Sequence, residues 1–390
     1  MKFKCNSIDL QKAINIVEKA IAVRSALPIL ENIYMDLSDN QLILRGNDLE
    51  LGIEYRMPIN SIEEPGTILT KSKTMSSIIA KLPNQSLNLT VKEEKIKITG
   101  NNADFTIHSE NSEDYPVFPS IESGQLVHFT VAELRQLIQH TVFSVSFDET
   151  KKFLNGILIK NQDKKLVFVA TDGYRLALKK SKTTTIDTNF EVIAPYKAVY
   201  ELNKILQGVA DDQEIQMSVS EKQVAFKMDQ LVLISRVIQG QFPDYNQVIP
   251  DSSEYRYNIS KDELLIAAER AAIIASSSNN VVKLLFDNNQ LVITASAPAL
   301  GDFKESLQTK EGSCSHSAKI ALNVRLILDV IKIIDTDEVS FLFNNELSPC
   351  QLIPLTDNSF TYIIMPIRTS DFQTTPETVN VESEVEVTST

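Results

Sequence analysis

Apolar residues recur along this chain at two spacings, one typical of helices and the other typical of strands. Between Ser7 and Ala22 they return every three or four positions, which predicts an amphipathic helix with Ser7 as its N-cap. The strand-like stretches Asn32–Leu37 and Gln41–Arg45 stand on either side of a Ser-Asp-Asn turn, which predicts a β-hairpin. The chain is therefore expected to begin with a short strand and this helix, followed by antiparallel strands.

The same order of elements returns twice more along the chain. The stretch Leu42–Leu49 aligns with Leu166–Gly173 and with Leu291–Pro298, at a step of about 125 residues. This period is that of a whole domain, since solenoid repeats are about 20–50 residues long. We therefore predict three tandem, structurally similar α+β domains, at 1–125, 126–251 and 252–368.

Each repeat is expected to contain two helices and six to eight strands, with the helices laid against antiparallel sheets. In the middle and last copies, the first helix is predicted at Thr130–Ser144 and at Ser260–Ala275, respectively. The helix of the last copy is expected to begin with a capping box of Ser260 and Glu263. The second helices are predicted at Lys73–Leu82, Tyr196–Leu206 and Val324–Ile334. Further strands are predicted at Lys95–Thr99, Phe105–His108, Gly156–Lys160, Leu166–Ala170, Val282–Phe286 and Leu291–Thr294.

The charge balance changes what partners the chain can have. Its net charge of −13 repels phosphates, so nucleic acid could bind only where positive charge gathers on one surface. Part of the acidity is local, because residues 369–390 hold five acidic residues and neither Lys nor Arg. That stretch has no apolar periodicity and is predicted to be a disordered acidic tail.

Positive charge does gather on the predicted helices. Lys12 and Lys19 are two helical turns apart and so share one face, as do Lys197 with Lys204 and Arg325 with Lys332. The remaining helices carry Lys73, Lys81, Arg135 and Arg270. Ordinary solvated helix faces are the alternative explanation. If the helices share one surface, that surface would bind phosphates without reading bases.

The composition gives no sign of a metalloprotein, a disulfide or redox protein, or a membrane protein. The three cysteines are far apart, and the four histidines are scattered with no ligand spacing, so neither a metal nor another cofactor is expected. No apolar run approaches a membrane span, and no signal peptide follows the first residues, which predicts a cytoplasmic protein.

Several short motifs carry a family resemblance. They are Ala170–Ala177 (ATDGYRLA), Phe242–Tyr245 (FPDY), Met365–Arg368 (MPIR), and Arg24 followed by Leu27–Leu30. In this order, and with the threefold repeat, they resemble the bacterial beta sliding clamp family, the beta subunit of DNA polymerase III, over residues 1–368.

The resemblance implies a non-catalytic protein of the DNA clamp fold that acts as a processivity factor in replication. Two subunits would join head to tail into a ring around double-stranded DNA, with helices on the inner face and antiparallel sheets on the outer face. Phe105 and Ile107 of one subunit would meet Ile273 and Ile274 of the other. Plain core burial is the alternative for either isoleucine.

The resemblance also implies a pocket for short linear motifs of the replicative polymerase, the clamp loader and repair polymerases. The matching residues would offer an apolar groove with arginines at its rim, and plain core packing is the alternative for the aliphatic ones. They are Leu154, Thr171, Gly173, Tyr174, Arg175, Leu176, Pro243, Val248, Ile363, Met365, Pro366, Ile367 and Arg368.

The resemblance carries DNA contact to Arg24 and to the loop with Lys151 and Lys152, and it has two departures. Tyr174 stands where the family commonly has His, which implies a larger or more rigid pocket wall. The acidic tail follows Arg368, where the family usually ends, and could shield the pocket, compete with partners or have no effect.

Two other functions are weighed against a clamp. Asp48 and Asp172 occupy equivalent positions in the first two copies and could serve metal-dependent phosphoryl transfer. The third copy has Ala297 there, and a role of the aspartates in shaping turns explains them without catalysis. A repeat scaffold that never closes on DNA would instead be a monomer that binds circular and linear DNA equally.

Overall fold

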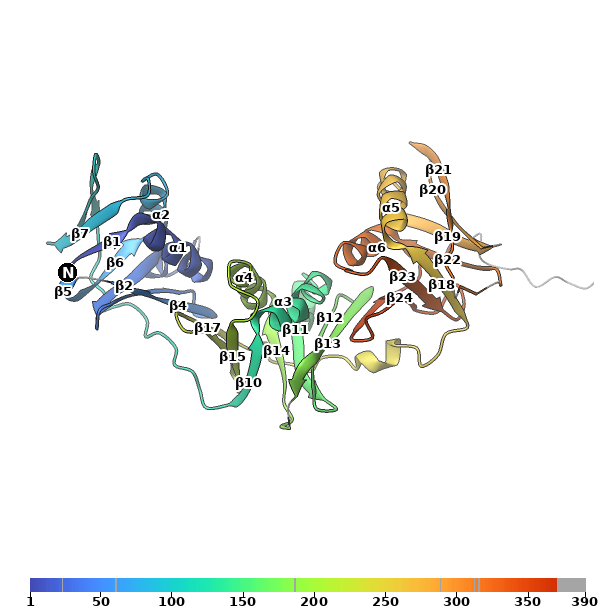
Figure 1. Ribbon diagram of the computed structural model, residues 1–390, viewed down its shortest axis with the longest axis horizontal. Helices are drawn as coiled ribbons and strands as arrows, with labels where there is room; N and C mark the ends of the chain where they lie inside the picture. Colours follow the sequence, from blue (N-terminus) through green and yellow to red (C-terminus); the bar gives the residue numbers. More distant parts are fainter. Residues whose placement is uncertain are drawn as a thin grey trace, which may run out of the picture. The chain divides into compact units, whose positions relative to one another are not determined.

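The computed structural model describes residues 1–22, 24–59, 62–185, 187–287, 289–311, 313–314 and 316–369. These residues form two compact units. The first consists of Met1–Tyr245 with Asp357–Tyr362, and the second of Asn246–Thr356 with the chain from Ile363 onward (Figure 1). Among the described residues, no helix is long and apolar enough to cross a membrane.

The first third of the chain has two helices and nine strands, one strand more than expected because the three-residue β5 is separate. Its elements are β1 (Lys2–Asn6), α1 (Ser7–Val17), η1 (Glu18–Ala20), η2 (Pro28–Glu31), β2 (Asn32–Ser38), β3 (Gln41–Asn47), β4 (Leu51–Pro58), β5 (Ile62–Glu64), β6 (Gly66–Lys71), α2 (Ser72–Ile79), β7 (Ser86–Lys92), β8 (Lys95–Thr99) and β9 (Asp104–His108).

The start of α1 differs from the prediction in its cap. The side chain of Asn6, not Ser7, accepts the hydrogen bond from the Ile8 amide, at 2.8 Å. The Ser7 hydroxyl instead donates to the Pro83 carbonyl, a partner that lies far away in sequence. The other end of α1 lies against β3 at Gly46, where a Cβ atom would be 2.3 Å from the Val17 carbonyl oxygen.

The middle third repeats this plan, and Thr130 caps its first helix by accepting from the Glu133 amide. Its elements are β10 (Gln125–Thr130), α3 (Val131–Gln139), η3 (Val142–Ser144), η4 (Glu149–Leu154), β11 (Gly156–Gln162), β12 (Lys165–Thr171), β13 (Arg175–Thr185), β14 (Glu191–Pro195), α4 (Tyr196–Leu206), β15 (Glu214–Val219), β16 (Gln223–Lys227) and β17 (Leu231–Arg236).

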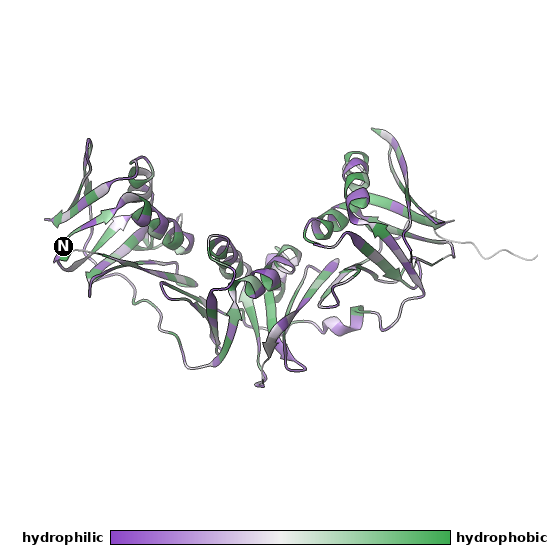
Figure 2. Cartoon of the chain, viewed as in Figure 1, coloured by the Kyte–Doolittle hydropathy of each residue, from purple (hydrophilic) through white to green (hydrophobic). Residues whose placement is uncertain are grey.

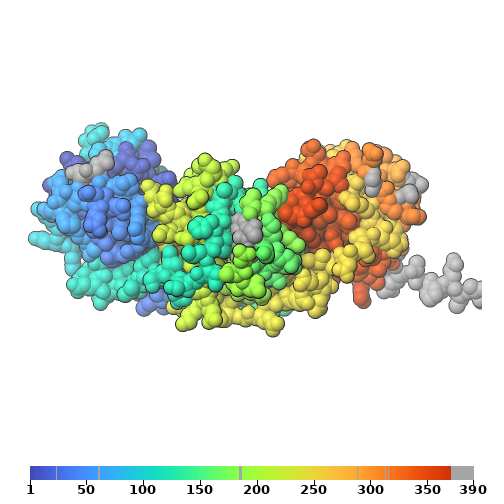
Figure 3. All heavy atoms as spheres, turned by 60° about the horizontal axis from the view of Figure 1, so that its bottom comes forward, coloured from blue at the N-terminus to red at the C-terminus, as the bar shows by residue number. Residues whose placement is uncertain are grey.

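One antiparallel sheet of the first unit contains strands from both the first and the middle third of the chain. Its strand order is β10-β15-β16-β17-β4-β3-β2-β6, and β17 pairs with β4 in the register Leu231↔Tyr55 and Leu233↔Ile53. A second sheet has the order β5-β1-β7-β8-β9, and β14-β11-β12-β13 are also neighbours. The segment between β9 and β10 lies on the surface of this unit (Figure 3).

The second unit contains the last third. Its elements are β18 (Tyr255–Ser260), α5 (Lys261–Ala275), β19 (Val281–Asp287), β20 (Gln290–Ala297), β21 (Gly301–Gln308), β22 (Ala318–Asn323), α6 (Val324–Ile331), β23 (Glu338–Phe343) and β24 (Cys350–Pro354), with the end of β25 (Phe360–Ile364) paired to β24. Four strands form a sheet in the order β21-β20-β19-β22, and α5 packs on one face of it.

The predicted capping box of α5 does not form. The Ser260 side chain makes no capping hydrogen bond, and the Lys261 amide donates to the Asp337 carbonyl at 2.8 Å. The Glu263 carboxylate lies 4.0 Å from the Lys310 ammonium. A backbone carbonyl from the connection between α6 and β23 thus replaces the expected local cap.

Candidate functional site

The helices of the first unit gather on one side of it. In Figure 1 α1, α2, α3 and α4 lie along the upper side of this unit, with the strands β4, β17, β15 and β10 below them. Most of their apolar residues are buried, although Ile8 is exposed, and Figure 2 shows hydrophobic and hydrophilic residues along each of these helices. Lys12, Lys73 and Lys81 are exposed, and no ion pair joins them to other residues in the part of the chain that the structure describes.

Other predicted cations on these helices form ion pairs with carboxylates. Lys19 of η1 and Lys204 of α4 both pair with Glu201, at 3.4 and 3.3 Å, and Lys197 pairs with Asp48. Partial burial lowers the pKa of Lys204, but the hydrogen bond and charge of Glu201 outweigh it and raise that pKa. Carboxylates from neighbouring elements thus neutralise much of this surface.

Arg135 has a structural position. Its guanidinium donates to the Leu206 carbonyl at 2.7 Å and the Val209 carbonyl at 3.0 Å, and it pairs with Asp211 at 2.6 Å. These bonds join α3 to the end of α4, so the predicted exposed charge on α3 is wrong.

A hollow of about 760 Å³ lies between α1 and the end of α4. Lys12, Lys19 and Lys204 line it together with apolar residues such as Ile8 and Val209. The sequence gives no signal of this hollow, because it forms between two repeats.

The helices of the second unit show the same mixture. Arg325 of α6 is exposed, and the structure gives it no ion pair among the described residues. Lys332 lies 3.6 Å from Glu269, and Arg270 pairs with Glu305 at 2.9 Å.

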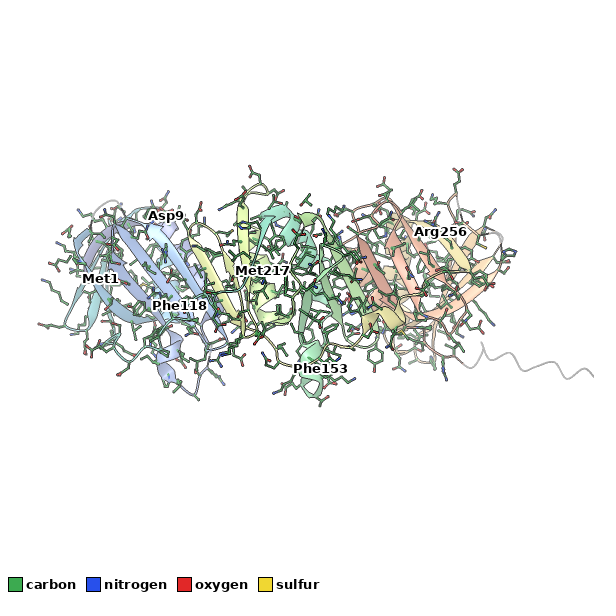
Figure 4. All side chains as sticks on the ribbon, turned by 90° about the horizontal axis from the view of Figure 1, so that it is seen from below. Met1, Asp9, Phe118, Phe153, Met217 and Arg256 are labelled. Carbon is green, nitrogen blue, oxygen red and sulfur yellow. The ribbon has the colours of Figure 1, made fainter. Side chains whose placement is uncertain are left out.

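The loop residues predicted to contact DNA are accessible. Lys151 and Lys152 are exposed on η4, whose first turn is capped by Asp148. Figure 4 shows the neighbouring Phe153 on this short helical segment, which projects from the strands of the first unit. Arg24 is also exposed.

The pocket residues of the first unit divide into buried and accessible ones. Leu154 and Leu176 are buried, as plain core packing also predicts. Tyr174 is 72% exposed, and Pro243 is exposed. Gly173 has a φ of +91°, a conformation that favours glycine and lets Tyr174 project outward.

The turn that carries these residues is fixed by hydrogen bonds. The Thr171 hydroxyl donates to the Arg175 carbonyl at 2.6 Å, and the Arg175 guanidinium donates to Asp172 at 3.0 Å. The guanidinium also lies over the Phe143 ring, 5.5 Å from its centroid. Arg175 therefore braces this turn, which corrects the expectation of a guanidinium available at the rim.

The pocket residues of the second unit show a similar division. Ile363 is buried in β25, whereas Met365, Pro366 and Ile367 are half-buried and Arg368 is exposed. Val248 is half-buried in the short helix η5 (Tyr245–Val248). The accessible members are the ones left to bind a ligand.

Two unpaired edges carry the predicted interface residues. β9 ends its sheet, and Phe105 and Ile107 alternate along it as half-buried residues. β21 ends the four-stranded sheet of the second unit, and α5 beside it bears Ile273, which is 68% exposed, and the half-buried Ile274. Exposed apolar residues beside an open strand edge are typical of an interaction surface.

The two aspartates of the enzyme alternative both shape turns. Asp48 accepts from the amides of Glu50 and Leu51, at 3.0 and 2.7 Å. Asp172 accepts from those of Tyr174 and Arg175, at 2.9 and 3.0 Å. No group of three or more His, Cys, Asp or Glu residues that could hold a metal occurs within the described ranges.

Comparison with known proteins decides the family. Models of the DNA polymerase III beta subunit match in three parts: the N-terminal domain at residues 1–119, the central domain at 128–244 and the C-terminal domain at 246–368. A beta sliding clamp from Staphylococcus epidermidis is 33% identical over 365 residues, which cover 91% of this chain and 96% of that protein. The chain belongs to the beta sliding clamp family.

Solved clamp structures agree with this family over nearly the whole chain. The sliding clamp from Bacillus subtilis is 29% identical, with a TM-score of 0.89 over 95% of this chain and 99% of that one. The clamp from Bartonella birtlesii, solved with griselimycin bound, is 27% identical, with a TM-score of 0.90 over 95% and 100% of the two chains. The predicted clamp fold of three tandem α+β domains is confirmed.

Proposed function

We propose that two copies of this chain close head to tail into a ring around duplex DNA and tether the replicative polymerase to it. The observation that carries this proposal is the match of three successive clamp domains along one chain. Such a ring acts by topology, so it needs neither a cofactor nor catalysis. The turn-shaping roles of Asp48 and Asp172 favour this non-catalytic function over phosphoryl transfer.

DNA would be held through phosphate contacts of the helix cations. Lys12, Lys73, Lys81 and Arg325 are the first candidates, since they are exposed without a carboxylate partner in the described chain. Lys19, Lys197, Lys204 and Lys332 would contribute less, because a phosphate must compete with the acidic residue beside each. A loosely held duplex suits a protein that slides.

Ring closure would use the open edges of β9 and β21. Phe105 and Ile107 of one subunit would cover Ile273 and Ile274 of the other, which removes apolar surface from water. The same contact occurs twice in a closed dimer, so both strand edges are covered.

Partner proteins would bind through short linear motifs. Tyr174, Pro243, Met365, Pro366 and Ile367 are accessible and apolar or amphipathic, and they suit leucine or phenylalanine anchors. Arg368 is exposed and can hold a carbonyl or an acidic group. The polymerase, the clamp loader and repair polymerases would compete for these residues in the cytoplasm.

Retention on circular DNA tests the ring. Protein loaded on a nicked circle should stay bound through gel filtration and should be lost once the circle is cut to a linear form. Equal retention on both forms would exclude a topological link and would favour an open scaffold.

A paired substitution tests the peptide site. Tyr174→Ala with Met365→Ala should weaken binding of a polymerase-derived motif peptide by at least about tenfold, since two apolar contacts are lost. The dimer mass should not change, which separates this effect from misfolding. An unaltered peptide affinity would move the site elsewhere.

A further inference from the structure

A hollow of about 490 Å³ lies on the four-stranded sheet of the second unit. It is lined by residues of β19, β20 and β21 together with Thr369, where the described chain ends. The described part of the chain therefore ends at this hollow.

The approach of the chain to the hollow is fixed by a backbone bond. The Ile367 amide donates to the Ala321 carbonyl of β22 at 2.8 Å, and Ala321 pairs with Lys283 in the neighbouring β19. Two residues later, Thr369 lines the hollow, and its hydroxyl is buried without a hydrogen-bond partner among the described residues. The chain thus crosses from the edge strand toward the middle of the sheet.

The residues facing this segment offer positive charge. In the register of the sheet, Lys283 of β19 lies opposite Thr294 of β20, and Thr294 lies opposite Lys304 of β21. The two lysines therefore flank the threonine in one row across three strands. Alternate residues of these strands, such as Leu284 and Ile293, are buried. The lysine row therefore lies on the face opposite to α5, with Val281 as apolar surface beside it and Asp302 near one end.

The chain beyond Thr369 has the matching chemistry. It continues as Ser370, Asp371 and Phe372, and Phe372 is the only aromatic residue of the sequence after Thr369. An extended chain advances about 3.3 Å per residue, so Asp371 and Phe372 reach no more than about 10 Å past Thr369. That distance matches the width of two strand spacings, the span from Lys283 to Lys304.

We propose that Asp371 and Phe372 dock in this hollow of their own chain, with the Phe372 ring on the apolar surface and the Asp371 carboxylate between the lysines. The contact anchors the acidic tail on the sheet face opposite to α5. A tail held there keeps its negative charge from α6, where the proposed function assigns Arg325 and Lys332 to DNA. Asp302 at one end of the hollow repels the later glutamates, so the docked part is short.

Hydrogen exchange of the full-length protein, followed by mass spectrometry of the 370–376 region, tests the docking. We expect its amides to exchange about tenfold more slowly than in Phe372→Ala, because docking shields them from water. Lys304→Glu should remove the protection, and adding Asp371→Lys to it should restore it. Lys227→Glu, the same charge change on an exposed lysine of β16, is the matched control and should have no effect.

Three outcomes would overturn the proposal. The region could exchange at the rate of an unstructured peptide in the unchanged protein. The protection could persist in both Phe372→Ala and Lys304→Glu, which would place the tail elsewhere. The protection could fall on dilution, which would make the binding surface that of a second copy.

Discussion

At the scale of single residues, Lys179 places a positive charge inside the first unit. Its side chain is almost fully buried and pairs with Asp357 at 2.6 Å, while the exposed Lys182 lies 3.4 Å from the same carboxylate. The hydrogen bonds from Lys179 and Ser359 outweigh the burial of Asp357, which acts in the opposite direction, and hold its pKa well below the usual range. This pair ties the segment before β25 to the first unit.

Asp357→Asn should lower the free energy of unfolding by about 2 kcal/mol near neutral pH, because it removes the negative charge that pairs with a buried ammonium. Lys182→Met, which removes the exposed partner of the same carboxylate, should cost less than about 1 kcal/mol. Urea unfolding of the three proteins measures both values.

The pH dependence of that difference follows from the lowered pKa. A carboxyl whose pKa falls on folding stabilises the protein above its unfolded value of about 4, and this contribution is lost as the pH drops through the folded value. The gap between Asp357→Asn and the unchanged protein should therefore be constant above about pH 5 and shrink below it. A gap that widens in acid would contradict this account.

The sequence indicates which residues stand at helix ends and turns, but it does not indicate their hydrogen-bond and stacking partners. Ser7 is not the cap of α1, since its hydroxyl donates a hydrogen bond to the carbonyl of Pro83, which is far away in the sequence. Arg175 has the expected place in the turn, but a stacked ring and a carboxylate hold it there. The spacing of apolar residues predicts on which side of a helix or strand a residue lies, but it does not predict which residue of another element contacts it.

At the scale of elements, helix faces in this protein combine lysines with acidic neighbours. Glu201 of α4 pairs with Lys204 on its own helix and with Lys19 of η1. The helices themselves were predictable from a spacing of three and four, and α4 has the predicted ends. Their ion pairs were not, because the partners of Lys19 and Lys197 come from a different repeat.

Glu201→Gln should strengthen DNA binding, since it releases two lysines that otherwise share one carboxylate. The slope of log affinity against log salt should steepen by about 1–2, at about 0.9 per phosphate neutralised. Fluorescence anisotropy with a short duplex over a salt series measures this slope.

The matched control is Glu93→Gln, the same change of charge at the turn between β7 and β8. It should raise affinity only slightly through the net charge and leave the slope as it was. Equal slopes in the two variants would mean that Glu201 does not mask a DNA contact.

At the scale of the whole molecule, the threefold repeat was the strongest signal in the sequence. Three similar domains could be predicted because their strands and helices return at one step, and the family models match the same order. The hollow between α1 and α4 and the one under Thr369 could not, because each forms where separate elements meet. The predicted domain ends near 125 and 251 stay predictions.

Ile273→Asp should dissociate the proposed dimer, because it would bury an unpaired carboxylate on α5 within the proposed interface. We expect the dimer dissociation constant to rise by about 100-fold or more. Sedimentation equilibrium measures it.

Leu126→Asp is the matched control, since Leu126 is another apolar residue with more than half of its surface exposed. Its dimer should be as stable as that of the unchanged protein. If both variants dissociate equally, or neither does, the assembly uses other surfaces.

The pairing of β17 with β4 joins two repeats through their peptide groups. Peptide groups are the same in every sequence. The side chains at this junction therefore need only be compatible with an extended chain. Substitutions can therefore accumulate on both sides of the junction without separating the repeats. Ancestral duplication followed by long divergence would leave such a joint intact even where little recognisable similarity between neighbouring modules survives.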